Sequence, residues 1–231
     1  MCTVIVRRDG AGPAEVLAVR DELVGRPFDD PGRWWPEQPD VVGGRDRQAG
    51  GSWCVTDVRR GRTALVLNRP LRRVADPGAP SRGVLPLLAA EHGPKWVEHL
   101  DPGGMATFTV VLVEPDSTLV WDFDGDTLLS RALPSGTAMV TSGGAEDGKA
   151  DRFLPAFDGA PVEGWPDLVA GQVPLDDPAA LVVHHPVALP DGTAGTFATV
   201  LVQQLRAVPG RLDVAWSRTP ELTPWSTSRW Q

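Results

Sequence analysis

Short runs rich in apolar and β-branched residues, each closed by a turn, recur along most of this 231-residue chain. The first run opens with Cys2 and continues to Arg8, a turn follows over residues 9–13, and Ala14 to Val19 returns. Strands joined by turns this short pair antiparallel, so we expect the chain to begin with a β-hairpin. Because most later strands are also joined by short turns, we expect an α+β protein whose antiparallel sheets carry helices on their outer faces.

The same reading of hydrophobic periodicity predicts about nine strands and three helices in all. Residues 23–52 are rich in Pro, Gly and Trp and are expected to be irregular, and residues 218–231 are expected to form a surface tail. No linker or internal repeat divides the chain, so residues 1–231 are expected to form one domain. Further strands are expected at residues 53–58, 63–68, 107–113, 118–123, 137–141, 196–205 and 211–216, and helices at 83–92, 147–157 and 177–184.

Composition narrows the class of partner. The formal net charge is −8, with only two lysines, Lys95 and Lys149. A nucleic-acid partner requires clustered basic residues, so none is expected. No apolar run reaches the ~18 residues of a membrane-spanning helix. The start lacks the charged and apolar regions of a signal peptide, so we expect a cytoplasmic protein without a membrane span. The sequence does not indicate an oligomeric state.

Cys2 follows the initiator methionine directly. Removal of Met1 would leave an α-amine, with a pKa of about 7.7–8.0, beside a thiol with a pKa of about 8.5. A base and a nucleophile on one residue are the requirements of N-terminal nucleophile catalysis. The alternative is that Cys2 is a small apolar residue at the start of a strand. Cys54, between Trp53 and Val55, is expected to be structural.

Two other polar clusters resemble metal sites without matching them. Asp122, Asp124 and Asp126 alternate like a calcium loop, but Arg131 stands where an EF-hand needs its bidentate glutamate. We therefore expect a polar hairpin turn and no metal. His184 and His185 are adjacent, whereas a ligand pair on one helix face is spaced i, i+4. They are expected at the C-terminus of a short helix that Asp177 caps.

Four motifs follow one another in the first 70 residues. They are Met1-Cys2; Ala18-Val19-Arg20-Asp21-Glu22 with Arg26-Pro27; Gly43-Gly44-Arg45-Asp46 with Ala49-Gly50-Gly51-Ser52-Trp53; and the strand Ala64 to Asn68. In this order they resemble the NRDE family, also called the transport and Golgi organization protein 2 family. The glycine-rich third motif is the most specific of the four.

The resemblance implies a fold similar to that of the N-terminal nucleophile (Ntn) hydrolases, a four-layer αββα sandwich of two antiparallel sheets. It also implies that Cys2 is the nucleophile, that Arg20 and Asp21 lie beside it, and that Asn68 faces the same pocket. The chemistry of these side chains agrees. A guanidinium favours the thiolate, a carboxylate can orient the terminal amine, and an asparagine can donate to a developing oxyanion.

This chain departs from the family pattern at three places. Val19 replaces the Asn that precedes Arg-Asp-Glu, and Ser142-Gly143-Gly144 replaces Ser-Asn after the strand at Thr137. The basic residue expected before the strand at Thr199 is missing, because the segment reads Gly195-Thr196-Phe197-Ala198. An oxyanion donor near residue 143 would therefore be a backbone amide.

Three functions remain open from the sequence. The first is an N-terminal-cysteine amidohydrolase that acts on non-peptide amides or thioesters. The second is a non-catalytic protein of the same fold that binds an acyl-lipid or haem, with axial ligation by His184 or His185. The third is an interaction module built on residues 27–53. No cofactor is required by the first, and each of the first two needs a small-molecule or acyl-type ligand.

Overall fold

The computed structural model describes residues 2–10, 12–69, 74–144, 148–172, 175–177, 179–189, 191–218 and 225–231. These residues form two β-sheets and a small number of helices, an α+β architecture, as the sequence predicts. Every strand pairing inside the two sheets is antiparallel. Among the described residues, no helix is long and apolar enough to cross a membrane.

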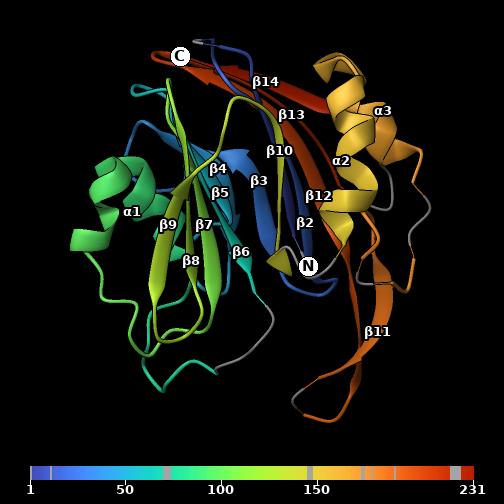
Figure 1. The fold of residues 1–231 in the computed structure, drawn as a ribbon. Helices are drawn as coiled ribbons and strands as arrows, with labels where there is room; N and C mark the ends of the chain where they lie inside the picture. The colour runs from blue at the N-terminus through green and yellow to red at the C-terminus, as the bar shows by residue number, and fades with distance from the viewer. Residues whose placement is uncertain are drawn as a thin grey trace.

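The strands of each sheet follow one another mostly in chain order (Figure 1). Sheet A consists of β10 (Gly136–Thr141), β1 (Thr3–Arg8), β2 (Glu15–Leu23), β12 (Ala194–Val208), β13 (Arg211–Ser217) and β14 (Ser226–Trp230), with β11 (His184–Ala188) paired to β12. Sheet B consists of β3 (Phe28–Gly32), β4 (Val41–Asp46), β5 (Cys54–Asp57), β6 (Arg62–Asn68), β7 (Phe108–Val113), β8 (Thr118–Phe123) and β9 (Leu128–Ala132). The expected opening hairpin is β1 and β2.

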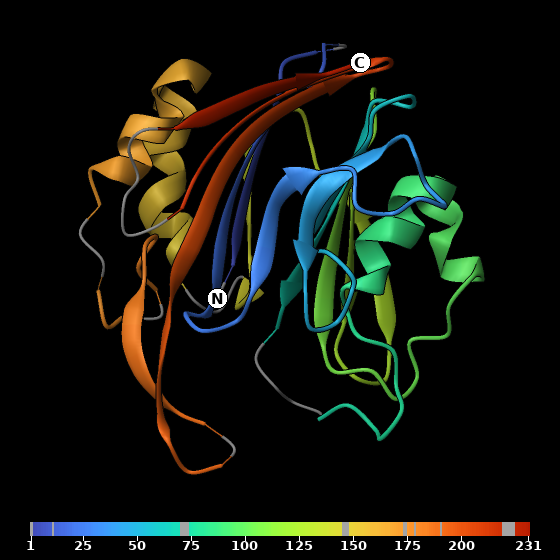
Figure 2. The same ribbon diagram turned by 180° about the vertical axis from the view of Figure 1, so that it is seen from behind.

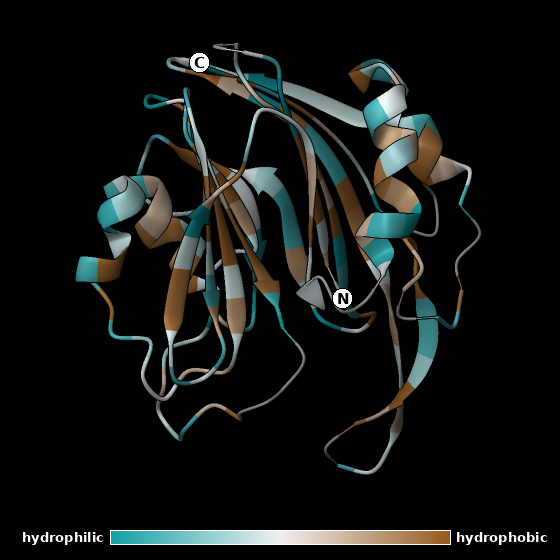
Figure 3. Ribbon diagram, in the orientation of Figure 1, coloured by the Kyte–Doolittle hydropathy of each residue, from teal (hydrophilic) through white to brown (hydrophobic). Residues whose placement is uncertain are grey.

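Central strands such as β1, β6 and β7 are buried on both faces, so alternate residues enter different cores. Val4 and Val6 of β1 pack between the sheets, whereas Ile5 packs on the outer face of sheet A. Leu65 and Leu67 of β6 likewise face sheet A, whereas Val66 faces away from it. Figure 3 shows apolar residues along the strands of both sheets.

Helices cover the outer face of each sheet (Figure 2). Helix α1 (Val84–His92) and the 3-10 helix η1 (Gly93–Glu98) pack on sheet B through Leu85, Ala89 and Trp96. Helices α2 (Lys149–Gly159) and α3 (Trp165–Ala170), joined through η3 (Val162–Gly164), pack on sheet A through Phe153, Phe157 and Trp165. The layers are therefore helix, sheet, sheet, helix.

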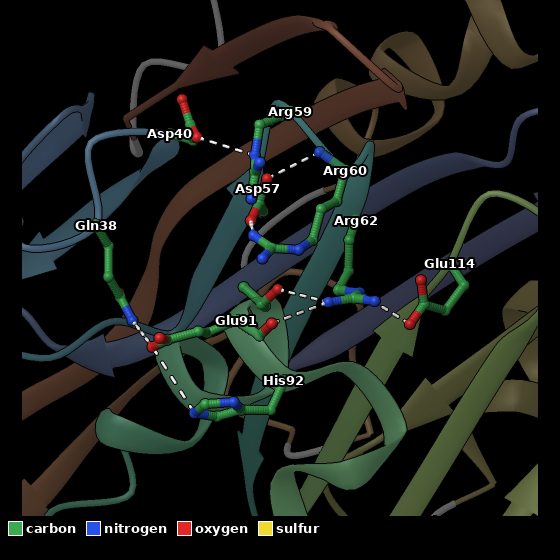
Figure 4. Close-up of polar contacts among 10 residues, drawn as sticks. Gln38, Asp40, Asp57, Arg59, Arg60, Arg62, Glu91, His92 and Glu114 are labelled. Atoms are coloured by element: carbon green, nitrogen blue, oxygen red, sulfur yellow. Dashed lines mark hydrogen bonds and ion pairs between the residues drawn. The ribbon is translucent and has the colours of Figure 1, made fainter.

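Helix α1 is held on sheet B by polar contacts at its C-terminal end (Figure 4). Arg62 of β6 donates to the carbonyl oxygens of Ala90 at 2.9 Å and Glu91 at 3.2 Å, and pairs with Glu114 at 2.8 Å. A cation at the last carbonyls of a helix satisfies unpaired acceptors and complements the helix dipole. Helix α1 matches the helix expected over residues 83–92 within one residue. Helix α2 overlaps the helix expected over 147–157 but begins at Lys149 and ends at Gly159; Asp147 lies outside the described residues.

The prediction that residues 23–52 are irregular is wrong. They contain β3 and β4, which form the edge of sheet B. Their pattern is hidden in the sequence because Gly43 and Gly44 replace the apolar residues of a strand. A Cβ on Gly43 would lie 2.4 Å from the carbonyl oxygen of Cys54, so close backbone packing excludes the side chains that normally reveal a strand.

The expectation of a helix over residues 177–184 is wrong, and the expected surface tail contains a strand. His184 begins β11 instead of ending a helix, and Asp177 accepts from the amide of Ala179 in a turn. The apolar run before His184 forms a turn and bends and packs on sheet A through Leu181 and Val182, and the carbonyl oxygen of Val183 accepts from the amide of Thr199. The expected surface tail ends in β14, which pairs with β13; residues 219–224 lie outside the described residues. With these additions the described residues contain fourteen strands.

Arg7 of β1 fastens α2 to sheet A. Its guanidinium donates to the carbonyl oxygens of Asp158 at 2.9 Å and Ala160 at 2.7 Å, and also to that of Phe157. It lies 5.2 Å from the ring centroid of Trp165. These carbonyls end α2, so one cation satisfies several helix acceptors at once.

We expect Arg7→Met to lower the free energy of unfolding by about 2–3 kcal/mol, because hydrogen bonds to a charged group are among the strongest. Urea titration measures the change. The control is Arg206→Met, which removes only a half-exposed ion pair with Glu15 at 3.4 Å and should cost less than about 1 kcal/mol. Equal losses in the two variants would contradict the role given to Arg7.

Candidate functional site

The four residues proposed from the sequence line one cavity of about 180 Å³. Cys2 directly precedes β1, Arg20 and Asp21 lie on β2, and Asn68 ends β6 of the opposite sheet. The cavity therefore lies where the ends of strands from both sheets meet. Residues far apart in the sequence reach it because sheet A stacks on sheet B.

Cys2 is half-buried and is fixed by its own main chain. Its carbonyl oxygen accepts from the backbone amide of Ser142 at 3.1 Å and from the Ser142 hydroxyl at 3.2 Å. Its Sγ lies 3.7 Å from the carbonyl oxygen of Asp21. Burial raises the pKa of the Cys2 thiol, and the charge of Asp21 raises it further, while Arg20 lowers it. The effect expected of Arg20 is thus present, but burial outweighs it.

Arg20 is held between aromatic rings. Its guanidinium lies 4.1 Å from the ring centroid of Trp53 and 4.8 Å from that of Phe28, and the side chain is 4 % exposed. Its Nη2 lies 3.6 Å from Glu22. The buried Nη1 atom has no hydrogen-bond partner within the described part of the chain. The cation is therefore positioned by stacking and keeps a donor for a ligand.

The glycine-rich motif builds this side of the cavity. A Cβ on Gly44 would lie 2.2 Å from the ring of Trp53, so only glycine leaves room for the indole that stacks on Arg20. A Cβ on Gly51 would lie 2.5 Å from the backbone of Gly83, and Ser52 donates its amide to Gly83 at 2.9 Å. The close approach at Gly51 sets the segment before α1 against the cavity.

Asp21 points to the other side of β2. Thr199 donates to Asp21 Oδ1 at 2.6 Å, and the register between β2 and β12 shifts between Thr199 and Leu201, a β-bulge. A bulge bends and twists a strand locally. Arg20 and Asp21, which are adjacent on β2, both line the cavity at this point. Burial raises the pKa of Asp21, whereas the charge of Lys149 and the hydrogen bond from Thr199 lower it.

Lys149, the first residue of α2, is a site residue that the sequence analysis missed. It is fully buried and donates to the Thr3 hydroxyl at 3.3 Å. Its positive charge lowers the pKa of Asp21, so the two groups interact electrostatically. The one available signal was rarity, since the chain contains only two lysines.

Three further charged residues of the cavity were also missed as site residues. Arg26 binds Asp46 through two contacts of 2.7 Å, and Asp46 also accepts from the amides of Gln48 and Ala49. Arg82 precedes α1 and donates to the carbonyl oxygen of Thr107 at 2.9 Å. Arg26 and Asp46 belong to the sequence motifs, but nothing in the pattern distinguishes Arg82 from a surface arginine.

Asn68 is exposed at the end of β6, and its backbone pairs with Phe108. Its place in the lining of the cavity agrees with the expectation that it faces the Cys2 pocket. Gly143 follows Ser142 directly, so its backbone is close in the chain to the atoms that hold Cys2.

The other clusters lie elsewhere. Asp124 accepts from the amides of Asp126 and Thr127, at 2.9 and 2.8 Å, which is the polar hairpin turn expected from the sequence. In the described ranges, no group of three acidic, histidine or cysteine side chains is arranged to hold a metal ion. His184 and His185 pair with Ala198 and Phe197 of β12 and are not among the residues that line the Cys2 cavity.

The family model described as Transport and Golgi organisation 2 matches residues 1–113. This is the family that the motifs resemble, so the expectation is confirmed over that range, which contains Cys2, Arg20, Asp21, Asn68 and Arg82. A search of curated proteins found no match.

Proposed function

We propose, from the family match over residues 1–113, that this chain is an N-terminal-cysteine hydrolase of amides or thioesters, related in fold to the Ntn hydrolases. The observation that carries the proposal is one cavity lined by a thiol, a stacked guanidinium, a buried carboxylate and a strand-end asparagine. The order of layers, helix, sheet, sheet, helix, supports the same relationship.

The reaction requires removal of Met1, which leaves the α-amine on Cys2. Sγ attacks the substrate carbonyl carbon, and its proton passes to the α-amine while a carbon–sulfur bond forms. The tetrahedral intermediate expels the amine, or the thiol of a thioester, which takes that proton as its bond to the carbonyl carbon breaks. A water molecule then attacks the acyl-enzyme, the carbon–sulfur bond breaks, and Sγ regains a proton as the carboxylic acid leaves.

The surrounding groups support each step. Asp21, held by Thr199 and facing Lys149, can orient the α-ammonium group. Arg20 stabilises the thiolate against the burial that raises the pKa of Cys2. The side-chain amide of Asn68, with a backbone amide near Gly143, can donate to the oxyanion.

The cavity also distinguishes the proposal from the alternative of a non-catalytic binding protein. Sites that enclose drug-sized ligands occupy about 300–1,000 Å³ and are mostly apolar, whereas this cavity has about 180 Å³ and several charged side chains. Its size and charge suit the reacting end of a substrate better than a flat apolar ligand such as haem.

Intact-mass analysis tests the function. We expect the purified chain to lack Met1 and, when quenched in acid during incubation with butyryl-p-nitroanilide or with N-butyrylglycine, to carry a butyryl group on the peptide that begins with Cys2. The adduct should be absent from Cys2→Ser and present in Cys54→Ala, because Cys54 is buried between the sheets. A chain that retains Met1, or one that gains no adduct while remaining folded, would refute the hydrolase.

A further inference from the structure

The arginines of the Cys2 cavity differ in how far they are neutralised. Arg26 binds Asp46 through Nε and Nη2, both at 2.7 Å. Arg20 lies 3.6 Å from Glu22, beyond the 2.7–2.9 Å of a charge-assisted hydrogen bond. Arg82 donates to a backbone carbonyl, and the described residues supply no carboxylate within 4.0 Å of it. Arg26 is therefore structural, and two cations remain for another partner.

The acids of the cavity are engaged by donors of the chain itself. Glu22 accepts from the amide of Leu23 at 2.9 Å, Asp46 from Arg26 and two turn amides, and Asp21 from Thr199. Among the described residues, Arg20 and Arg82 have no carboxylate at the distance of a charge-assisted hydrogen bond. Arg20 is 96 % buried and its Nη1 has no acceptor among the described residues, an arrangement that is costly unless a ligand completes it.

Arg20 and Arg82 are both close enough to Cys2 for their charges to affect its thiol. The charges of Arg20 and Arg82 each interact with the Cys2 thiol, and all three side chains line the same cavity. A substrate whose carbonyl carbon is attacked by Sγ could therefore place a second, negatively charged group against these arginines, with only a few bonds between the two groups. Guanidinium groups bind carboxylates through paired hydrogen bonds.

We propose that the cavity recognises a carboxylate of the substrate through Arg82 and the Nη1 atom of Arg20, next to Cys2. Resting on the proposed function, this makes the substrate a carboxylate-bearing amide such as an N-acylated amino acid. In that class the carboxylate carbon is two bonds from the scissile nitrogen, a spacing that suits a small cavity. Arg82 is then a residue that determines specificity.

Two alkylating reagents test the inference without any turnover. Iodoacetate carries a carboxylate and iodoacetamide its neutral amide, and both react with the same thiol. We expect the ratio of their rates at Cys2, at pH 8, to exceed the ratio for N-acetylcysteine amide by at least about tenfold, by charge attraction at the site. N-acetylglycine should slow alkylation of Cys2, and N-acetylglycinamide should not.

Substitutions assign the effect to Arg82. Arg82→Gln should lower the rate ratio about tenfold, Arg82→Lys should retain part of it as a charge without the fork geometry, and Arg206→Gln, outside the cavity, should leave it unchanged. A wild-type ratio equal to that of the free thiol, with no protection by N-acetylglycine, would overturn the inference. A raised ratio in a chain that forms no acyl adduct would refute the hydrolase and leave the carboxylate site standing.

Discussion

Iodoacetamide at pH 8 should alkylate Cys2 at least about 100-fold faster than Cys54. Burial raises the pKa of Cys54 to about 12, so only about one molecule in 10⁴ carries its thiolate at that pH. Cys54 is also 2 % exposed and packs between the sheets. Cys2 is half-buried and lines the cavity, and Arg20 partly offsets the effect of burial on its pKa.

Peptide mass analysis after timed labelling measures the two rates. In denaturant both cysteines should react at similar rates, which controls for the intrinsic reactivity of each peptide. Because the pKa of Cys2 is raised, its rate should keep increasing with pH beyond the range of an ordinary thiol. Labelling of Cys2 at or below the rate of Cys54 in the folded protein would remove Cys2 as the nucleophile.

Lys149→Met should lower the free energy of unfolding by about 3–5 kcal/mol at pH 7, because removal of one member of a buried charge pair leaves the other uncompensated. Lys149 is fully buried and its charge lowers the pKa of Asp21. The matched control is Lys95→Met, which changes the net charge equally at an exposed position of η1 and should alter stability by less than about 0.5 kcal/mol.

The pH dependence and a second substitution identify Asp21 as the partner. Without Lys149, the pKa of folded Asp21 rises further above the unfolded value of about 3.9. A carboxyl group with a raised folded pKa binds its proton more tightly when folded, so stability is lost as pH rises through that interval. The defect of Lys149→Met should therefore shrink towards pH 4. It should also be largely relieved in Asp21→Asn/Lys149→Met, and a full defect in the double variant would contradict the pairing.

Local sequence patterns determined the elements that have clear boundaries. The hairpin of β1 and β2 and the strands β6 to β8 follow from short apolar runs bounded by turn residues, and helix α1 follows from an apolar run that Gly93 and Pro94 end. The same patterns failed at β3 and β4, where glycines take the positions of apolar side chains because another backbone or an indole fills that space. They failed at His184 because the preceding apolar run is buried on sheet A without forming a helix.

Within the candidate site, the motifs alone indicated Cys2, Arg20, Asp21 and Asn68. Only the tertiary structure added Lys149 and Arg82, which come from α2 and from the segment before α1. The two-residue alternation of side chains along a strand predicts which face of its sheet each residue occupies. Family motifs identify residues that lie near one another in the chain. The stacking of helices on sheets decides which charges from distant segments meet in one cavity. Burial in that cavity then makes an unpaired charge destabilising, so that each charge needs a partner from the chain or from a ligand.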